Sequence, residues 1–286
     1  MKNIGINVNT TKDPDKKMLN FIKKTIHRID KSVKVKVYEN CDGLDKDESS
    51  KLDVIIVLGG DGTILNTSKH ILDSSTPILG VNIGHLGFLA QVEVNSIENA
   101  LKKLFKGSYV IEERNMIQCI YDDGNGPKTY DGLNDVVLYK GIKSRIQRYD
   151  VYINDNFYNT FSGDGIIVST STGSTGYNLS AGGPIIYPSL DILCLTPMYS
   201  QFLTSRTIVL DNKCCITIAV IKNLKNVFLS VDGQEWIEIK ATNTIEVRRS
   251  KNKRKFIKFG DNYFNTLKDK INFKAKGCEG EVYEGN

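Results

Sequence analysis

The turn Gly59-Gly60-Asp61-Gly62-Thr63 follows the apolar run 54–58 directly, and it combines three glycines with one carboxylate. Glycine has no Cβ to block an incoming group, and it permits backbone angles that aim successive N–H groups into one concavity. A helix that begins after such a turn adds its own unpaired N–H groups and the positive end of its dipole. The segment therefore predicts a phosphate-binding site.

Asp61 indicates which chemistry such a site could support. A carboxylate beside phosphates repels them unless it faces a neutral hydroxyl, where it can accept the proton as that hydroxyl attacks a phosphoryl group. The alternative is that Asp61 only caps the following helix, because Asp is a favoured N-cap residue. Two better-known phosphate motifs do not fit, because no lysine follows these glycines as in a Walker loop and Leu65 occupies the third glycine position of G-x-G-x-x-G.

A second polar region lies between residues 161 and 185, where six of the seven residues 169–175 carry hydroxyls. We expect a short helix over 175–181, ended by Gly182-Gly183-Pro184. Hydroxyls and N–H groups at a helix start can bind an anion, and Tyr177 can stack on a base. A plain surface loop is the alternative interpretation of such a run of serine and threonine.

The pair Asn134-Asp135 stands just before the apolar run 136–139. An amide and a carboxylate side by side can bind an adenine edge and ribose hydroxyls respectively, although the same pair commonly forms an Asx turn. The segment 82–89 also follows an expected strand and offers His85 and Phe88 as candidate ligand contacts. His85 fits a structural histidine equally well.

The expected pattern of helices and strands that position these residues changes along the chain. Over the first 110 residues strands and helices alternate, which predicts an α/β domain with a Rossmann-like parallel sheet. Asp13-Pro14 is expected to cap the first helix, and the apolar run 52–58 predicts a strand buried on both faces. The expected strands are 5–8, 33–38, 52–58 and 78–81, and further helices are expected at 64–72 and 97–105, the latter ended by Gly107.

From Met116 onward, short strands separated by turn formers predict an all-β sandwich. We therefore expect an α/β domain over 1–113, a β-sandwich domain over 114–255 and a C-terminal segment, 256–286, that returns to the first domain. A cleft between the two domains is the expected ligand site. The expected strands of the sandwich are 136–139, 149–153, 165–169, 207–210, 216–221, 227–231, 236–239 and 244–247.

Composition narrows the class of protein. The 286 residues are 40% hydrophobic, enough to bury a core. No window reaches the roughly 18 apolar residues that a membrane span needs and no signal peptide is evident, so we expect a cytoplasmic protein without a membrane partner. The net charge of +5 suits a nucleotide better than nucleic acid, although lysines also simply keep a surface soluble. The six cysteines show no C-x-x-C spacing and are expected to be reduced.

Taken together, four motifs resemble those of the NAD kinase family, and the resemblance spans most of the chain. The G-G-D-G-T turn alone is shared with lipid kinases and is similar to loops of phosphofructokinases, whereas the hydroxyl run combined with an N-D pair is more specific. The four motifs are Gly59-Gly60-Asp61-Gly62-Thr63, Gly84-His85-Leu86-Gly87-Phe88, Asn134-Asp135 and Thr172-Gly173-Ser174-Thr175-Gly176-Tyr177.

The resemblance implies an enzyme that moves the γ-phosphoryl group of ATP onto the 2′-hydroxyl of the adenosine ribose of NAD, giving NADP. It implies Asp61 as the general base, with Mg²⁺ held mainly by ATP phosphates and water. It also implies a homodimer or homotetramer in which a neighbouring subunit completes the site. Asn134 and Asp135 would hold the adenine and ribose, and Asp164 would lie by the nicotinamide. The substrate-binding residues that it implies are Gly62, Phe88, Asn134, Asp135, Arg145, Ser162, Asp164, Thr175, Gly176, Tyr177, Asn178, Ser180, Tyr199 and Gln234.

Three positions depart from the family pattern. Asp135 stands where many members have glutamate, and it has a shorter reach to the same hydroxyl. Ser162 stands where members often carry Lys or Arg, so a phosphate contact is either missing or supplied by Arg145 or Arg148. Gln234 matches a substrate-contacting position only loosely.

Two other functions stay open from the sequence. A lipid kinase of the diacylglycerol type is built on the same glycine–aspartate turn, but it should need attraction to a membrane, for which the segment 16–28 is the nearest candidate helix. A nucleotide sensor could bind NAD without chemistry, although the intact Asp61 speaks against it.

Overall fold

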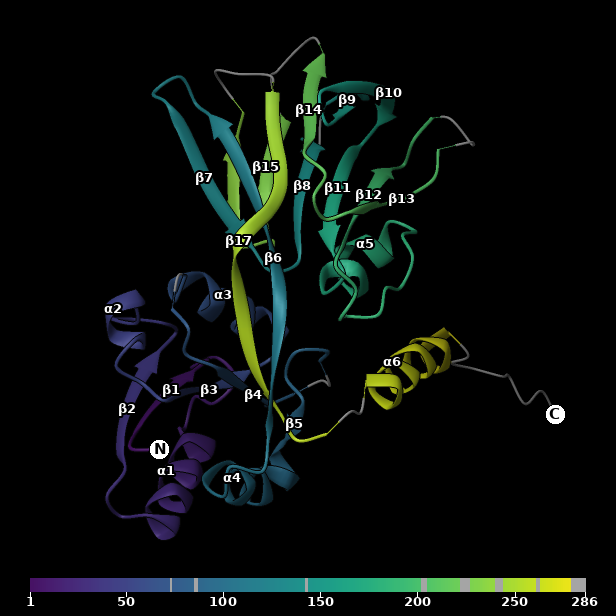
Figure 1. Cartoon of the computed structure of the whole chain (residues 1–286). Coiled ribbons are helices and arrows are strands. Elements are labelled where there is room, and N and C mark those ends of the chain that lie inside the picture. Colours follow the sequence, from purple (N-terminus) through teal and green to yellow (C-terminus); the bar gives the residue numbers. More distant parts are fainter. Residues whose placement is uncertain are drawn as a thin grey trace, which may run out of the picture. The chain divides into compact units, whose positions relative to one another are not determined.

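The computed structural model describes residues 1–72, 74–84, 87–141, 144–201, 205–221, 227–239, 244–260 and 263–278. The chain divides into two compact units, and each is described by itself. The first unit combines Met1–Glu112 with Lys255–Asn286, and the second is Glu113–Arg254. Figure 1 labels most of the helices and strands of both units.

The first unit is built on a parallel sheet. Its strands lie in the order β4-β3-β1-β2, and β5 and the end of β17 both pair with β4. Every residue of β3 is buried, which confirms the strand buried on both faces that its continuous apolar run predicts. The strands are β1 (Asn3–Val8), β2 (Lys34–Glu39), β3 (Val54–Gly59), β4 (Ile78–Asn82), β5 (Val92–Glu93) and β17 (Thr244–Lys258).

Helices cover both sides of this sheet, with α1 and α4 below it and α2 and α3 above it in Figure 1. The apolar faces of α1 and α4 share one core with the strands. The helix over 97–105 lies where its spacing predicts, and Gly107 follows it with φ 70°. The helices are α1 (Lys17–Ile29), α2 (Lys46–Ser49), α3 (Asp61–His70), the single turn η1 (Val94–Ser96), α4 (Ile97–Phe105) and α6 (Tyr263–Cys278).

The start of α1 corrects one expectation. The N-cap position belongs to Lys16, whose φ is 54°, and not to Asp13. Asp13 nevertheless supplies the hydrogen bonds of a cap, because its carboxylate accepts the N–H groups of Met18 at 3.1 Å and Leu19 at 2.9 Å. Asp13 therefore caps the helix across an extra turn of chain, and not from the N-cap position itself.

The second unit is a sandwich of two mainly antiparallel sheets, as the sequence predicts. One sheet runs β13-β12-β11-β8-β15-β16, and the other contains β10-β9-β14-β17 with β6 and β7. Side chains of both sheets meet in one core cluster. The strands not yet given are β6 (Val110–Asp122), β7 (Pro127–Gly132), β8 (Asp135–Lys140), β9 (Gln147–Ile153), β10 (Asn156–Gly163), β11 (Gly165–Thr170), β12 (Ile192–Met198), β13 (Ile208–Asp211), β14 (Ile216–Ile221), β15 (Val227–Val231) and β16 (Glu235–Glu238).

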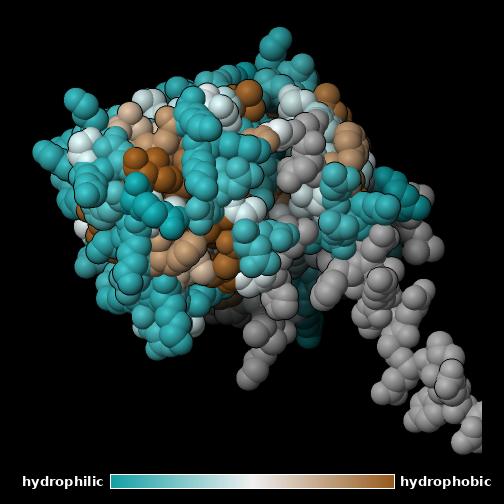
Figure 2. All heavy atoms as spheres, turned by 90° about the horizontal axis from the view of Figure 1, so that it is seen from below, coloured by the Kyte–Doolittle hydropathy of each residue, from teal (hydrophilic) through white to brown (hydrophobic). Residues whose placement is uncertain are grey.

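The surface is mainly hydrophilic on the face that Figure 2 shows, with smaller hydrophobic patches between the polar side chains. No helix in the described part of the chain is long and apolar enough to cross a membrane. Two aromatic side chains of the second unit are nevertheless widely exposed, Tyr199 at 78% and Trp236 at 64%.

The thiols that the structure describes are free. Cys41, Cys119, Cys194, Cys214 and Cys215 form no disulfide. Burial raises the pKa of Cys119 to about 12 and that of Cys194 to about 11. Both thiols therefore stay protonated and poorly nucleophilic near neutral pH.

Candidate active site

The glycine turn in the first unit leads from β3 directly into α3. Gly60 takes the N-cap position with an extended backbone, and the helix begins at Asp61, three residues before the predicted start. The hydrogen bonds of the Asp61 carboxylate go to residues 88–90 and not to N–H groups of α3. The capping role considered for this side chain is therefore not what the structure shows.

The Asp61 carboxylate instead accepts three consecutive backbone N–H groups from another segment. Its Oδ2 accepts from Phe88 at 2.8 Å, and its Oδ1 accepts from Leu89 at 3.0 Å and Ala90 at 3.1 Å. A carboxylate offers about four lone-pair positions, so these bonds leave one on Oδ2. They fix the orientation of the group and keep one acceptor position available to a donor.

Glycines around Asp61 make room for this arrangement. A Cβ on Gly87 would lie 2.0 Å from Asp61 Oδ1, so a larger residue there would displace the carboxylate. A Cβ on Gly59 would lie 2.2 Å from Thr63 Oγ1. Gly62 differs, because nothing lies within 4 Å of a Cβ built there. The first two glycines serve close packing, whereas Gly62 leaves its backbone open to an approaching group.

Phe88 contributes its backbone to the Asp61 site, while its half-buried ring packs against α6. The ring centroid lies 6.3 Å from that of Tyr263, and the Lys270 ammonium lies 5.6 Å from the Phe88 centroid. His85 and Leu86, which belong to the same sequence motif, lie outside the described residues.

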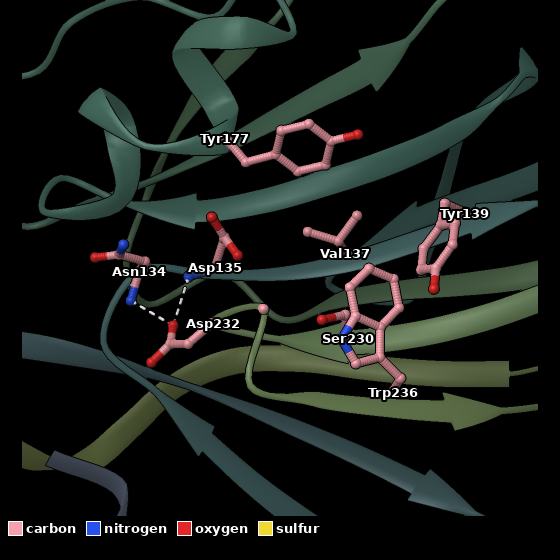
Figure 3. A pocket seen from close by; sticks show the side chains of 9 residues that line it. Asn134, Asp135, Val137, Tyr139, Tyr177, Ser230, Asp232 and Trp236 are labelled. Carbon is pink, nitrogen blue, oxygen red and sulfur yellow. Dashed lines mark hydrogen bonds between the residues drawn. The ribbon is translucent and has the colours of Figure 1, made fainter. Parts of the chain in front are cut away.

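A pocket of about 310 Å³ lies within the second unit. Its walls come from β8, the start of α5 (Tyr177–Ser180), the β15–β16 turn and β16 itself. In the view of Figure 3, the Tyr177 and Trp236 side chains lie on either side of Val137. The lining residues are Asn134, Asp135, Val137, Tyr139, Tyr177, Ser230, Asp232, Gly233 and Trp236.

Asp232 holds the start of β8 in place. Its Oδ2 accepts the N–H of Leu133 at 2.7 Å. Its Oδ1 accepts the N–H groups of Asn134 at 2.7 Å and Asp135 at 3.1 Å, the two bonds drawn in Figure 3. From the other side, the Thr170 N–H donates to the Asn134 carbonyl at 2.8 Å and the Thr170 hydroxyl donates to the Leu133 carbonyl at 2.7 Å. The backbone of the pair is thus fixed by distant residues.

The Asn134 side chain is left available by this arrangement. Its Oδ1 is buried, and among the described residues it accepts no hydrogen bond. The Asx turn considered for this pair would use that oxygen locally, so the structure does not show it. A buried acceptor without a donor costs about 1–3 kcal/mol, which favours a ligand that brings a donor such as an amino group.

The electrostatics of the pocket suit sugar hydroxyls and flat rings. Burial, and then the neighbouring charge of Asp232, raise the pKa of Asp135 to about 7. Burial also raises the pKa of Asp232, although its three N–H donors act in the opposite direction. The described lining residues include no lysine or arginine, so this pocket is a poor place for phosphate groups.

Aromatic side chains form one wall of the pocket. The rings of Trp236 and Tyr139 pack edge to face with centroids 5.0 Å apart, and Tyr139 stacks on Phe228 at 5.6 Å. The sequence does not mark Trp236, Tyr139 or Ser230 as site residues, because single aromatic or hydroxyl residues within strands are usual in a core. The only local signal is that Trp236 follows Asp232-Gly233, two residue types favoured in turns.

The hydroxyl-bearing residues 169–175, which precede α5, mainly make hydrogen bonds that stabilise their own loop. Ser174 Oγ donates to the Ser171 carbonyl at 2.7 Å, and Ser171 Oγ donates to the Leu190 carbonyl. The Asn178 side chain is fully buried, donates to the Ser174 carbonyl at 3.3 Å and accepts from Thr196 Oγ1 at 2.6 Å. The predicted helix over 175–181 is instead the single turn η2 (Gly173–Thr175) followed by α5.

Of the predicted residues in the second unit, the pocket brings together Asn134, Asp135 and Tyr177. Asp164 lies apart from its lining and pairs with Lys140, with 3.3 Å between carboxylate and ammonium. The predicted residues that do not line it are Arg145, Ser162, Asp164, Thr175, Gly176, Asn178, Ser180, Tyr199 and Gln234.

Arg148 is one of the two residues expected to supply the charge of a basic side chain at position 162, and it lies beside Ser162. Ser162 is buried in β10 and faces Arg148 directly across the β9–β10 pair, so the two side chains share one face of the sheet. Arg148 is exposed there. Arg145 is also exposed but precedes β9.

These features of the two units by themselves indicate a class of protein. The parallel-sheet unit carries a glycine turn with an oriented carboxylate, and the antiparallel sandwich carries an acidic and aromatic pocket. This combination is expected for a nucleotide phosphotransferase. In the described part of the chain, no group of three or more His, Cys, Asp or Glu side chains is placed to hold a metal ion.

Comparison with known proteins gives the family. Residues 3–109 match the ATP-NAD kinase N-terminal domain, and residues 133–259 match the ATP-NAD kinase C-terminal domain. The chain is 71% identical over 282 residues to an NAD kinase of Clostridium kluyveri, covering 99% of this chain and all of the relative. It is 45% identical to an NAD kinase of Clostridium botulinum, covering 98% and 100%. The chain belongs to the NAD kinase family, which confirms the resemblance of its motifs.

Solved structures confirm the predicted combination of an α/β region and a β sandwich. Yeast NADH kinase complexed with NADH superposes with a TM-score of 0.85 at 22% identity, covering 100% of this chain and 90% of that one. An NAD kinase from Archaeoglobus fulgidus in complex with ATP gives a TM-score of 0.78 at 24% identity, covering 94% and 98%. At these identities the likeness concerns the fold alone.

Proposed function

We propose that this chain transfers the γ-phosphoryl group of ATP to the 2′-hydroxyl of the adenosine ribose of NAD, giving NADP. The observation that carries this proposal is whole-chain identity to NAD kinases, at 71% and 45%. The oriented carboxylate of Asp61 supports it independently, because such a group suits the removal of a hydroxyl proton. The lipid-kinase and sensor alternatives gain no support from these relatives.

Asp61 acts as the general base in this proposal. The ribose hydroxyl donates to the lone pair of Oδ2 that no backbone N–H occupies. As the hydroxyl oxygen bonds to the γ-phosphorus, its proton passes to Asp61 and the bond to the bridging oxygen of ADP breaks. The three hydrogen bonds from residues 88–90 keep the carboxylate aimed, so little reorganisation accompanies the reaction.

The pocket of the second unit binds the nucleoside part of NAD in this proposal. Asn134 Oδ1 accepts from the adenine amino group, and Asp135 accepts from a ribose hydroxyl. Tyr177 and Trp236 offer rings against which the base can stack. Arg148, exposed opposite Ser162, supplies in this proposal the positive charge that a Lys or Arg often provides at position 162 in the family.

Mg²⁺ would neutralise charge on the ATP phosphates. The residues of the glycine turn fit a mostly hydrated ion, because magnesium keeps several waters and binds substrate phosphates. Asn82, at the end of β4, has a buried Oδ1 that accepts no hydrogen bond among the described residues. That oxygen can accept from a metal-bound water. Asp61 is occupied by its three N–H donors and has little capacity left for a direct metal bond.

We also propose that the chain works as a homodimer or homotetramer in the cytoplasm. Its family membership supports this, and so do the exposed rings of Trp236 and Tyr199, because tyrosine and tryptophan are enriched at protein interfaces. Light scattering of the purified chain during size-exclusion chromatography tests it. A monomeric mass at micromolar concentration would contradict the proposal.

The function is tested by incubating the purified chain with ATP, NAD and Mg²⁺. NADP is then measured with a dehydrogenase that requires the 2′-phosphate, which identifies the position phosphorylated. Reactions without ATP, and with diacylglycerol vesicles in place of NAD, serve as controls. NADP should form only when ATP and NAD are both present. Phosphorylation of the lipid but not of NAD would reject the proposal.

A further inference from the structure

The loop that follows β1 places a lysine beside the glycine turn. A Cβ built on Gly60 would lie 2.8 Å from Lys12 Nζ, and one built on Gly84 would lie 3.8 Å from the same atom. The ammonium therefore lies against the backbone of both glycines. In the described part of the chain it takes part in no ion pair or side-chain hydrogen bond, and the residue is exposed.

Asn9 fixes this loop to the turn. Its backbone N–H donates to the Leu58 carbonyl at 3.0 Å, which joins the loop to the end of β3. Its side-chain Oδ1 accepts the N–H groups of Thr11 at 3.1 Å and Lys12 at 3.2 Å. Its Nδ2 donates to Thr63 Oγ1 at 3.2 Å, within the first turn of α3. The main chain at Lys12 is thus tied to both elements that form the glycine turn.

Asn82 gives a second sign that a ligand belongs at this edge of the sheet. It faces Gly59 across the β3–β4 pair, and its Nδ2 donates to the carbonyl of Gly84 at 3.4 Å. The residue is only 5% exposed, yet among the described residues its Oδ1 accepts no hydrogen bond. Buried polar atoms are normally satisfied, so a donor from outside the chain fits here, such as a water on a phosphate-bound cation.

We propose that Lys12 binds the terminal phosphates of ATP at the glycine turn. The inference rests on the proposed function, since it takes this turn as the phosphate site and adds a cation to it. In a P-loop the cation comes from a lysine that follows the glycines. Here no lysine follows them, and the loop after β1 brings an ammonium to the same turn from another element. The flexible lysine stem allows the point charge to follow the phosphates.

The test replaces Lys12 by glutamine, which keeps much of the stem and removes the charge. The KM for ATP should rise about 10- to 100-fold, as expected for a lost charge-assisted hydrogen bond, whereas the KM for NAD and the Tm should stay unchanged. Lys12→Arg should recover most of the ATP affinity. Lys24→Gln removes the same charge from an exposed position on α1 and should leave the KM for ATP unchanged.

Direct binding separates this inference from the proposed function. Calorimetric titration with MgATP and with AMP, without NAD, should show a weaker affinity of Lys12→Gln for MgATP and an equal affinity for AMP. If wild type makes NADP while Lys12→Gln keeps its ATP affinity and KM, the inference about Lys12 is overturned and the function stands. If wild type makes no NADP, the function fails, and the MgATP titration still decides the phosphate contact.

Discussion

Two aspartates, one in each unit, accept hydrogen bonds from three consecutive backbone N–H groups. Asp61 binds those of residues 88–90, and Asp232 binds those of residues 133–135. In each case the carboxylate sits at a turn and fixes a segment that lies far along the chain. The separation is 27–29 residues for Asp61 and 97–99 for Asp232.

The two carboxylates differ in what surrounds their remaining face. Asp61 is followed by Gly62, where a Cβ would meet nothing within 4 Å, and the Lys12 ammonium lies against the same turn. Asp232 instead neighbours the buried Asp135, a like charge that raises the pKa of that carboxyl. In the proposed mechanism, the same hydrogen-bond pattern therefore serves a reacting group in one unit and a structural support in the other, and the surroundings decide which.

The largest effect is expected at Asp61. Asp61→Asn should lower kcat about 10²- to 10⁴-fold, the usual contribution of a general base, while NAD binding is kept. Steady-state assays and NAD titration measure the two quantities. Asp53→Asn is the matched control, since Asp53 also accepts two backbone N–H groups but lies before β3. Turnover near wild type in Asp61→Asn would make Asp61 a structural support like Asp232.

At Asp232 we expect a loss of stability and of NAD affinity, with little change in kcat. Asp232→Asn keeps the shape and tolerates the φ of 53°, but its amide group cannot accept one of the three N–H groups. The free energy of unfolding should fall by about 1–3 kcal/mol and the KM for NAD should rise. Urea denaturation and steady-state kinetics test this. A selective loss of kcat would erase the distinction between the two aspartates.

Trp236 tests whether the pocket of the second unit binds a flat ring. Trp236→Ala should raise the KM for NAD about 10-fold, because a stacking surface is lost, with little change in stability since the side chain is 64% exposed. Phe157→Ala is the control, an aromatic residue 59% exposed in the same unit that does not line the pocket. Equal effects of the two substitutions on KM would contradict a stacking role.

The smallest expected effect on NAD affinity concerns pH. Because the pKa of Asp135 is about 7 in the folded chain, against an ordinary value of 3.8, folding favours its protonated form. Its ionisation should lower stability progressively between about pH 4 and 7, and the loss should be complete above that range. The ionised form is also the better acceptor for a ribose hydroxyl, so NAD affinity should rise several-fold as pH increases through 7.

Asp135→Asn removes both trends if Asp135 causes them. Denaturation curves and NAD titrations between pH 5 and 8.5 should then be flatter than those of wild type. Asp155→Asn makes the same change in an exposed turn and should keep both slopes. If Asp135→Asn retains the rise in NAD affinity, another group titrates.

In the first unit the sequence predicts β3 and β4 because they are nearly continuous apolar runs, and β2 because apolar and charged residues alternate along it. In the second unit it misses β6, β7, β10 and β12. Most of β7 and the first half of β10 are exposed, so pairing with a neighbouring strand, and not burial, makes them strands, whereas β12 is largely buried and is missed all the same. No local pattern reports such pairing.

The residues of the candidate site also differ in how far the sequence alone indicates their role. Asp61 is recognisable because its glycines are sequence neighbours, whereas Asp232 is recognisable only as a turn former, since its hydrogen-bond donors lie 97–99 residues away. The hydroxyl run predicts an anion site, yet its Ser171 and Ser174 hydroxyls donate to carbonyls. Composition shows which groups are present but not which partners they take.

The sequence separation between Asp232 and its three donors also has a consequence for folding during synthesis. A ribosome releases residues 133–135 about a hundred residues before it releases the carboxylate that orders them. The last strand, through Phe256, likewise reaches the sheet of the first unit after every other strand has been made. A nascent chain that stalls before residue 232 therefore carries a pocket whose residues 133–135 are held by Thr170 but not yet by Asp232.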